Sequence, residues 1–237
     1  MSNIEQLIEY DKEVTLYLNG SNSLFWDGFL WVFTSTVIWI PLVLTLLYVI
    51  VKNNKLKETL LIITMIALVI FLSDRISSGL FKPYFQRFRP AQDANIMYLI
   101  DIVNNYRGGR FGFISSHAAN SFGVFTFIVL LIKNKQLNFL LLIWAILNSY
   151  SRIYLGVHYV GDILCGALLG CLVGYLVYKL YILIKQKLFS QSVYSFSKKH
   201  TVGGYLVTDV SLLFTVMYST VFLIAIIGIL TSQYKFF

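Results

Sequence analysis

Two histidines and a small group of cations stand in three short polar stretches of a mainly apolar chain. The stretches are Lys82 to Pro90, Phe113 to Asn120 and Ser151 to Asp162, and each lies beside a hydrophobic segment long enough to cross a bilayer. A charge at a membrane boundary is costly unless water or a partner group stabilises it. Because arginine binds oxyanions and histidine can act as a nucleophile or an acid, the stretches together indicate a site that binds and cleaves a phosphate ester.

The first stretch holds Lys82 and Arg89 at the outer end of the second apolar segment. If the chain between them turns, the two cations can bracket one dianion, and Pro90 ends any helix there. The alternative is a pair of interfacial cations whose side chains reach the lipid headgroups.

The second stretch places Ser115, Ser116 and His117 just before the third apolar segment. A helix N-terminus offers unpaired N–H groups and the positive end of the helix dipole, which favours phosphate binding. One of the two serines can also be the N-cap of the helix, and this is compatible with phosphate binding. For His117 the alternative is an interfacial histidine with ordinary hydrogen-bond partners.

In the third stretch, Ser151 and Arg152 are followed by His158 and Asp162. The last two are four residues apart, so they share one face at the start of a helix. A carboxylate bonded to one ring nitrogen fixes the tautomer and leaves the other nitrogen free to attack. The alternative is a capping aspartate with an unrelated histidine.

Composition excludes an ordinary soluble domain. The chain has 237 residues, of which 57% are hydrophobic and 13% charged, whereas soluble domains have about 45–50% apolar residues. The net charge of +8 does not indicate nucleic-acid binding, because the lysines lie in short loops between apolar runs. No signal-peptide pattern is found at the start. Cys165 and Cys171 do not share a helix face, so we expect free thiols and neither a disulfide nor a metal site.

The hydrophobic pattern predicts an all-α, multi-pass membrane bundle forming a single integral membrane domain, 1–237. Residues 4–18 read as an amphipathic helix on the membrane surface. About six spanning helices follow, each needing about 20 apolar residues: 28–51, 59–81, 117–132, 137–154, 160–184 and 206–230. The third is short, and the stretch 185–205 separates a five-helix body from an additional C-terminal spanning helix within 200–237. Gly166, Gly170 and Gly174 recur every four residues and predict close helix packing.

Lysines indicate the orientation. If the helices alternate, ten lysines fall on one side, which is cytoplasmic by the positive-inside rule: Lys52, Lys55, Lys57, Lys133, Lys135, Lys179, Lys185, Lys187, Lys198 and Lys199. Lys82, both motif histidines and Asp162 then fall on or near the other side. So do all six arginines, which are Arg75, Arg87, Arg89, Arg107, Arg110 and Arg152. Arginines outside need a reason other than topology, and an anionic substrate supplies one.

Together the three stretches resemble, in spacing and order, the signature motifs of the type 2 phosphatidic acid phosphatase superfamily. The matching positions are Lys82, Arg89 and Pro90; Ser115, Ser116 and His117; and Ser151, Arg152, His158 and Asp162. The resemblance covers roughly 59–175, which we take as the catalytic helical core. Two positions depart from the family pattern, because Ile114 stands where the family has proline and Ser116 where it has glycine.

The resemblance implies roles for these residues. His158 would attack phosphorus and form a phosphohistidine, Asp162 would orient it, and His117 would protonate the leaving oxygen. The phosphoryl oxygens would be held by Lys82, Arg89, Ser115, Arg152 and the amide of Ser116. The family needs no metal or other cofactor, and the sequence offers no carboxylate cluster for Mg²⁺. Asp74 and Arg75 are candidates for a supporting role, with Asp74 as a buried partner of Arg75 or Lys82.

By resemblance, the chain is expected to be a bacterial inner-membrane enzyme that removes phosphate from a lipid at the periplasmic, outer face. Undecaprenyl diphosphate or a lipid A phosphate is favoured, because a long outer loop with arginines suits a large headgroup. Arg87, Arg107 and Arg110 would contact a second phosphate, a sugar or neighbouring anionic lipid. The alternatives are a phosphatidylglycerophosphate or phosphatidate phosphatase, a catalytically silent lipid-phosphate transporter, and a membrane scaffold. The expected partners are lipids, and no nucleic acid is expected.

Overall fold

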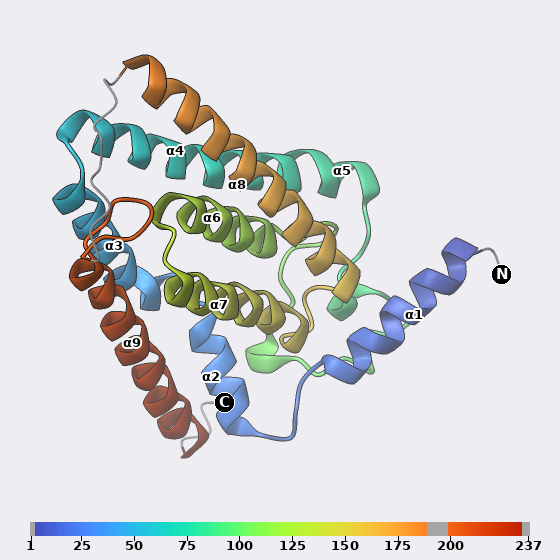
Figure 1. The fold of residues 1–237 in the computed structure, drawn as a ribbon. Helices are drawn as coiled ribbons and strands as arrows, with labels where there is room; N and C mark the ends of the chain where they lie inside the picture. The colour runs from blue at the N-terminus through green and yellow to red at the C-terminus, as the bar shows by residue number, and fades with distance from the viewer. Residues whose placement is uncertain (1–2, 189–198, 234–237) are drawn as a thin grey trace.

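The computed structural model describes residues 3–188 and 199–233, which form helices and connecting loops without a β-strand. The predicted all-α membrane bundle is confirmed (Figure 1). Its helices are α1 (Asn3–Leu18), α2 (Leu24–Phe33), α3 (Ile40–Asn53), α4 (Leu56–Asp74), α5 (Lys82–Phe85), α6 (Ser116–Ile132), α7 (Lys135–Tyr154), α8 (Val160–Leu188) and α9 (Val207–Gln233). The predicted linker 185–205 is only partly visible, since 189–198 lie outside the described residues.

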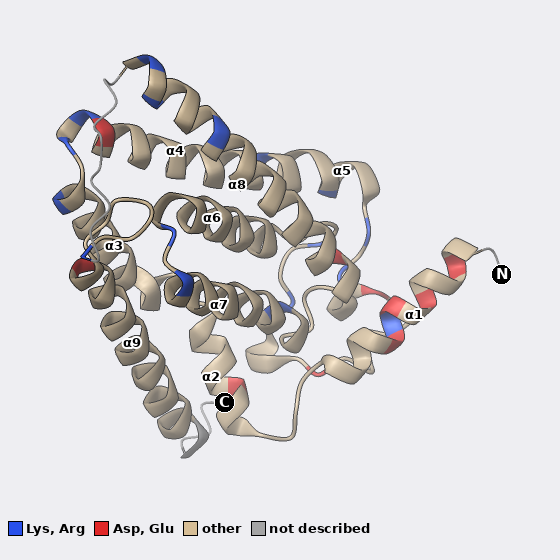
Figure 2. Cartoon of the chain, viewed as in Figure 1, with Lys and Arg blue, Asp and Glu red and all other residues tan. Residues whose placement is uncertain are grey.

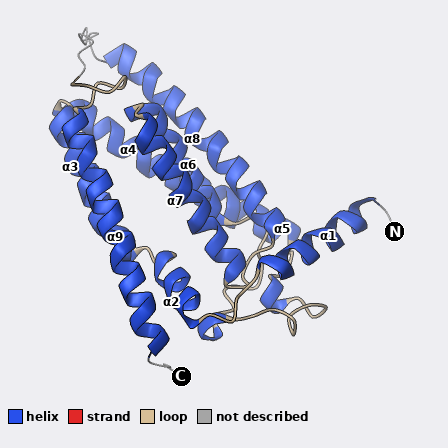
Figure 3. Cartoon of the chain, turned by 60° about the horizontal axis from the view of Figure 1, so that its bottom comes forward, coloured by secondary structure: helices blue, strands red, loops and turns tan. Residues whose placement is uncertain are grey.

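Helix α6 lies at the centre of the bundle and packs most closely against α8 (Figure 3). Gly166, Gly170 and Gly174 allow this contact. A methyl group at any of them would collide with a backbone carbonyl of α6, at Ser115, Ala119 and Gly123 respectively. The predicted close packing is therefore confirmed. It holds the starts of α6 and α8 side by side, which is where two of the three polar stretches lie.

The prediction of a single unbroken helix over 28–51 is wrong. The chain breaks after Phe33, and the helix pair Leu24–Phe33 and Val37–Asn53 is bent by 66°. Thr34, Ser35 and Thr36 occupy the break, and such side chains favour non-helical local hydrogen bonds. The indole of Trp39 donates to the carbonyl of Phe33 at 2.7 Å and closes the corner. Pro41 then stands at the start of α3, where a missing N–H costs nothing.

Three unbroken helices of the described residues are long and apolar enough to cross a membrane: Leu56–Phe85, Val160–Leu188 and Val207–Thr231. The bent pair would add a fourth if it counts as one span. Helix α6 has only 17 residues, and α7 carries several polar residues in its second half. The protein is thus a membrane helix bundle, and the count of about six spans remains a prediction.

The first and last helices of the chain, α1 and α9, pack against the rest of the bundle in different ways. Helix α1 projects from the end that also holds the long α5–α6 loop (Figure 3), and it leaves Ile4 and Leu7 exposed. Helix α9 packs along α2 and α3. Lys52 at the end of α3 donates to Asp209 of α9 at 2.7 Å. The C-terminal helix is therefore joined to the rest of the bundle by polar contacts as well as apolar ones.

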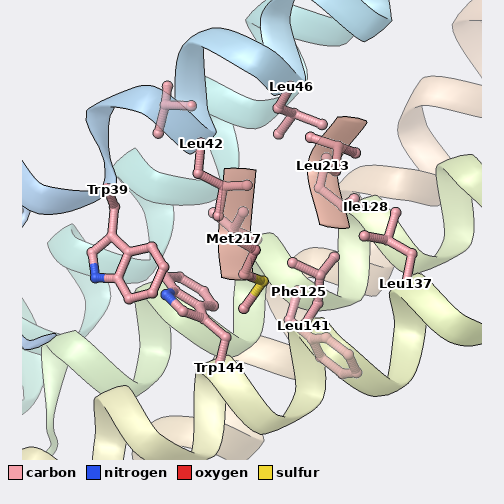
Figure 4. Close-up of a pocket in the computed structure, with 12 residues that line it drawn as sticks. Trp39, Leu42, Leu46, Phe125, Ile128, Leu137, Leu141, Trp144, Leu213 and Met217 are labelled. Atoms are coloured by element: carbon pink, nitrogen blue, oxygen red, sulfur yellow. The ribbon is translucent and has the colours of Figure 1, made fainter. Parts of the chain in front are cut away.

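Charges gather at the two ends of the bundle and leave the middle apolar (Figure 2). A small cavity of about 90 Å³ lies in this apolar middle, among α3, α6, α7 and α9 (Figure 4). Its wall includes Trp39, Leu42, Trp144 and Met217. A phosphate ester would find no charged partner there. Cys165 and Cys171 are free thiols, as predicted.

Candidate active site at the starts of α6 and α8

All three polar stretches meet at one end of the bundle. Ser115 N donates to the carbonyl of Asp162 at 3.0 Å, which joins the second stretch to the third. Lys82 Nζ donates to Ser116 Oγ at 2.8 Å, and this contact adds the first stretch. The guanidinium of Arg89 lies 3.3 Å from His158, counted from Nη1 to Nε2. The structure therefore brings together residues that are up to 80 positions apart, from Lys82 to Asp162.

His158 and Asp162 form a buried pair, with 1% and 0% of their side chains exposed. Nδ1 of His158 lies 3.2 Å from Oδ2 of Asp162, and the same oxygen accepts from Tyr159 N at 3.1 Å. An ionised carboxylate only accepts hydrogen bonds, so the network assigns the imidazole proton to Nδ1. Nε2 then keeps its lone pair and faces Arg89. This is the arrangement a histidine nucleophile requires.

The electrostatic setting keeps His158 neutral. It lies in the short segment between α7 and α8, outside both helices. Burial, followed by the positive charges of Arg89 and Arg152, lowers the pKa of His158 well below its usual range. Its Nε2 is therefore unprotonated at neutral pH, and in this structure it accepts the hydrogen bond from Arg89 Nη1.

Two buried guanidinium groups form no ion pair with a carboxylate of the described residues. Arg89 and Arg152 are 8% and 3% exposed, and the Nε atom of each has no hydrogen-bond partner in the described part of the chain. Arg152 is held by Thr34 Oγ1 at 3.1 Å and by the hydroxyl of Tyr106 at 3.2 Å. Burial and the charge of Arg152 lower the pKa of Arg89. Buried unpaired donors are costly, so both side chains fit a site built to receive an oxyanion.

Lys82 is placed by an irregular turn. Between α4 and α5 the helix widens to π geometry over Arg75–Phe81, a feature that often marks functional sites. Ser78 in this segment lies 2.8 Å from Ser116, hydroxyl to hydroxyl, and 3.4 Å from Lys82 Nζ. Ser116 was expected to offer only its backbone amide in place of the family's glycine. Its hydroxyl instead anchors Lys82, and Ser78 is a member of the site that the sequence did not reveal.

Ser115 is the N-cap of α6, which is one of the two compatible roles, capping and phosphate binding, expected for this serine pair. Its Oγ accepts from Ala118 N at 3.4 Å, and the residue is fully buried. The hydroxyl proton remains free to donate, so a phosphate contact stays a prediction. His117 follows in the first turn of α6 and is half-buried. It interacts electrostatically with His158 and with Arg152, so it lies within the same cluster of charges.

The structure does not bear out a buried Asp74. Asp74 and Arg75 are both exposed, because the π segment begins there and turns both side chains outward. Arg75 lies over the ring of Phe71 at 5.6 Å. Asp74 accepts a hydrogen bond from the Ser78 hydroxyl at 3.4 Å, and its charge also acts on Lys82. Arg75 therefore does not join the site.

The three loop arginines have different environments. Arg87 Nη1 donates to Asp162 Oδ1 at 3.0 Å, and its guanidinium lies 3.9 Å from the ring of Tyr159. Arg107 donates to the carbonyl of Ala91 at 2.6 Å, and Arg110 is exposed and stacks on two phenylalanine rings. Arg87 is thus a partner of the predicted catalytic carboxylate, a role that its position in the sequence did not indicate.

Glycines let the long loop close over the site. Gly112 N donates to the carbonyl of Arg87 at 2.9 Å, and Arg89 N to that of Arg110 at 3.3 Å. A Cβ atom on Gly112 would lie 2.9 Å from Asp162 Oδ2. Only glycine permits the loop backbone to lie this close to the carboxylate.

Comparison with known proteins agrees with this geometry. A family model described as the PAP2 superfamily matches residues 58–185, more than half of the chain. The chain belongs to the PAP2 superfamily. The matched residues include all three polar stretches, so the predicted membership and the predicted phosphatase class are confirmed.

Relatives with assigned names cover most of this PAP2 chain. The lipid A 4'-phosphatase of Bacteroides thetaiotaomicron is 43% identical over 176 residues, which cover 74% of this chain and 78% of that protein. The lipid A 4'-phosphatase of Porphyromonas gingivalis is 33% identical over 186 residues, 78% of each chain. Among solved structures, a transmembrane PAP2 type phosphatidylglycerolphosphate phosphatase from Bacillus subtilis has a TM-score of 0.56 at 20% identity, covering 81% of this chain and 90% of that one. This last likeness concerns the fold.

Proposed function

We propose that this membrane lipid phosphatase removes the phosphate of lipid A at the outer face of the membrane, through a phosphohistidine on His158. The observation that carries the proposal is the buried imidazole, with Nδ1 held by Asp162 and Nε2 directed at Arg89. The choice of lipid A is supported by the name of the relative that is 43% identical.

The chemistry proceeds in two displacements. Nε2 of His158 attacks phosphorus, the bond from phosphorus to the lipid oxygen breaks, and His117 gives that oxygen a proton. Water, losing a proton to His117, then attacks the phosphohistidine, and the N–P bond breaks to release inorganic phosphate. Charge on the phosphoryl oxygens is balanced throughout by Lys82, Arg89 and Arg152.

Of the three arginines in the long loop, only two are left to contact a large headgroup. Arg87 is engaged by carboxylates, which leaves Arg107 and Arg110 as exposed cations for a sugar or a second phosphate. Undecaprenyl diphosphate is therefore the second candidate substrate. The experiment must compare kcat/KM on lipid A with kcat/KM on undecaprenyl diphosphate.

Phosphate release from purified protein tests the proposal. The substrates would be lipid A, undecaprenyl diphosphate, phosphatidylglycerophosphate and phosphatidate, each assayed with EDTA present. We expect the highest kcat/KM on lipid A, full activity under chelation, and an acid-labile phospho-enzyme in quenched samples.

His158→Ala should abolish both turnover and the phospho-enzyme. His200→Ala is the matched control, because His200 is exposed beside the start of α9 and should leave both unchanged. A higher kcat/KM on undecaprenyl diphosphate would reassign the substrate. Loss of activity in EDTA that Mg²⁺ restores would contradict the phosphohistidine, and no release from any lipid would favour the silent transporter.

A further inference from the structure

Helix α1 contacts the first turn of α8 through two polar side chains. Asp11 Oδ1 accepts from Gly161 N at 2.8 Å, and Thr15 Oγ1 accepts from Val160 N at 3.1 Å. The first N–H groups of a helix have no partner within it. Residues at the beginning of the chain therefore cap the helix that carries Asp162, across separations of 150 and 145 positions.

Asp11 also reaches the catalytic carboxylate through one intermediate. Its second oxygen, Oδ2, accepts from Arg87 Nη2 at 2.7 Å, while Nη1 of the same guanidinium donates to Asp162 Oδ1 at 3.0 Å. The guanidinium is planar and rigid, so fixing one end of the fork fixes the other. Its face rests on the ring of Tyr159.

Both carboxylate oxygens of Asp162 accept hydrogen bonds from identified donors. Oδ2 receives His158 Nδ1 and Tyr159 N, and Oδ1 receives Arg87. The rotation of this carboxylate, and hence the direction of the imidazole, depends on where Arg87 points. The Arg87 side chain is 24% exposed, so without Asp11 it can turn towards water.

We propose that Asp11 is a positioning residue for the reaction, acting through Arg87 to hold Asp162 in line with His158. This inference rests on the proposed role of His158 as the nucleophile. It gives α1 a function that neither its amphipathic pattern nor the superfamily motifs assign, since Asp11 lies outside the matched residues 58–185.

Asp11→Asn is the decisive variant. Both oxygens of Asp11 accept a hydrogen bond, and an amide of the same shape must turn an NH₂ group towards one of the two donors. We expect kcat to fall on the order of tenfold, as for other partners that orient a reacting group. KM should change little, because the hydrogen bonds of Asp11 go to Arg87 and Gly161 and not to the predicted phosphate-binding residues.

Two control variants separate positioning from folding. Glu9→Gln removes a carboxylate from the same helix at a side chain that is 52% exposed, and kcat should stay at the wild-type value. Thr15→Val removes the neighbouring cap of α8 without touching Arg87, so it should lower the unfolding temperature and leave kcat unchanged. A kcat loss in Thr15→Val equal to that in Asp11→Asn would show that capping alone matters, and would overturn the proposal.

A double-mutant cycle tests the route through Arg87. Asp11→Asn combined with Arg87→Gln should be about as slow as Arg87→Gln alone. If the two losses multiply, Asp11 does not act through Arg87.

The imidazole itself gives a readout that does not need turnover. In protein labelled with ¹⁵N-histidine, the Nδ1–H proton of His158 should move upfield and exchange faster in Asp11→Asn, but not in Glu9→Gln. If the wild type hydrolyses no lipid phosphate and this shift still occurs, the proposed function fails, and what stands is the structural link from Asp11 through Arg87 and Asp162 to the imidazole. If the enzyme is active and Asp11→Asn matches Glu9→Gln in both kcat and resonance, the positioning role fails alone.

Discussion

At the scale of single residues, the protonation of His158 decides the pH dependence. Burial and the charge of Arg89 lower its pKa, so the imidazole stays neutral until the pH falls well below the ordinary value of 6.5. Activity should be present above the lowered pKa and be lost as the pH falls through it. In a plot of kcat/KM against pH, the acidic limb from His158 should lie below 6.5, and in Arg89→Gln it should move to higher pH. An acidic limb that stays in place in Arg89→Gln would contradict this setting.

The two histidines should respond differently to the leaving group. His117→Ala removes the acid but keeps the nucleophile, and general acid catalysis contributes roughly 10²–10⁴-fold. A nitrophenyl phosphate needs little protonation, so the defect of His117→Ala should shrink on it while that of His158→Ala should not. The measurement is the ratio of rates on lipid and nitrophenyl substrates for each variant. If His158→Ala is the variant rescued, the two roles are reversed.

The predictable part of the site is the part whose residue types are dictated by chemistry. Lys82, Arg152 and His158 could be singled out because charged and nucleophilic side chains beside apolar segments need a purpose. Asp11 and Ser78 could not, since an aspartate on an amphipathic helix and a serine inside a span have many ordinary explanations. Their partners are fixed by how α1 docks and by the π turn, which no local pattern encodes.

At the scale of elements, the contact between α6 and α8 holds the start of α6, which carries His117, beside the start of α8, which carries Asp162. Gly170 faces the carbonyl of Ala119 with no room for a side chain. Gly170→Val should push the two helices apart, with a loss of about 1–3 kcal/mol typical of overpacking, and should also lower kcat. Thermal unfolding and phosphate release would measure both. Gly79→Ala is the control, because a methyl group there meets nothing within 4 Å; an unfolding temperature for Gly170→Val equal to this control would contradict the packing.

Because the break between α2 and α3 was not predicted, the contact between Thr34 and Arg152 was not predicted either. An apolar run over 28–51 predicts one helix, since hydropathy does not register three hydroxyl residues in a row. The structure ends α2 at Phe33, and Thr34 thereby reaches Arg152 at 3.1 Å. In a continuous helix, Thr34 would be an ordinary residue of a membrane span. Arg152 would then lose one of its two side-chain hydrogen bonds, the one to Thr34, and keep the one to Tyr106.

At the scale of the whole molecule, the separation of charges predicts the orientation. Lys52, Lys133, Lys185 and Lys187 stand at the C-terminal ends of α3, α6 and α8, whereas the site lies at the starts of α6 and α8. We therefore predict that 82–116 and 151–159 face the outside and that 52–58 and 133–136 face the cytoplasm. In a background without Cys165 and Cys171, Tyr98→Cys should react with an impermeant maleimide in intact cells, and Gln136→Cys only after lysis. Labelling of Gln136→Cys from outside would reverse the topology.

The caps that α1 supplies to α8 have a consequence for biosynthesis. The ribosome makes Asp11 and Thr15 long before Val160 and Gly161, and contacts of such long sequence separation form late. Helix α1 therefore cannot form these contacts until the first turn of α8 has been made. A chain released early, with α1 to α7 but no α8, lacks Asp162 altogether. The pair of His158 and Asp162 is therefore complete only once the chain has been made beyond α7 and into α8.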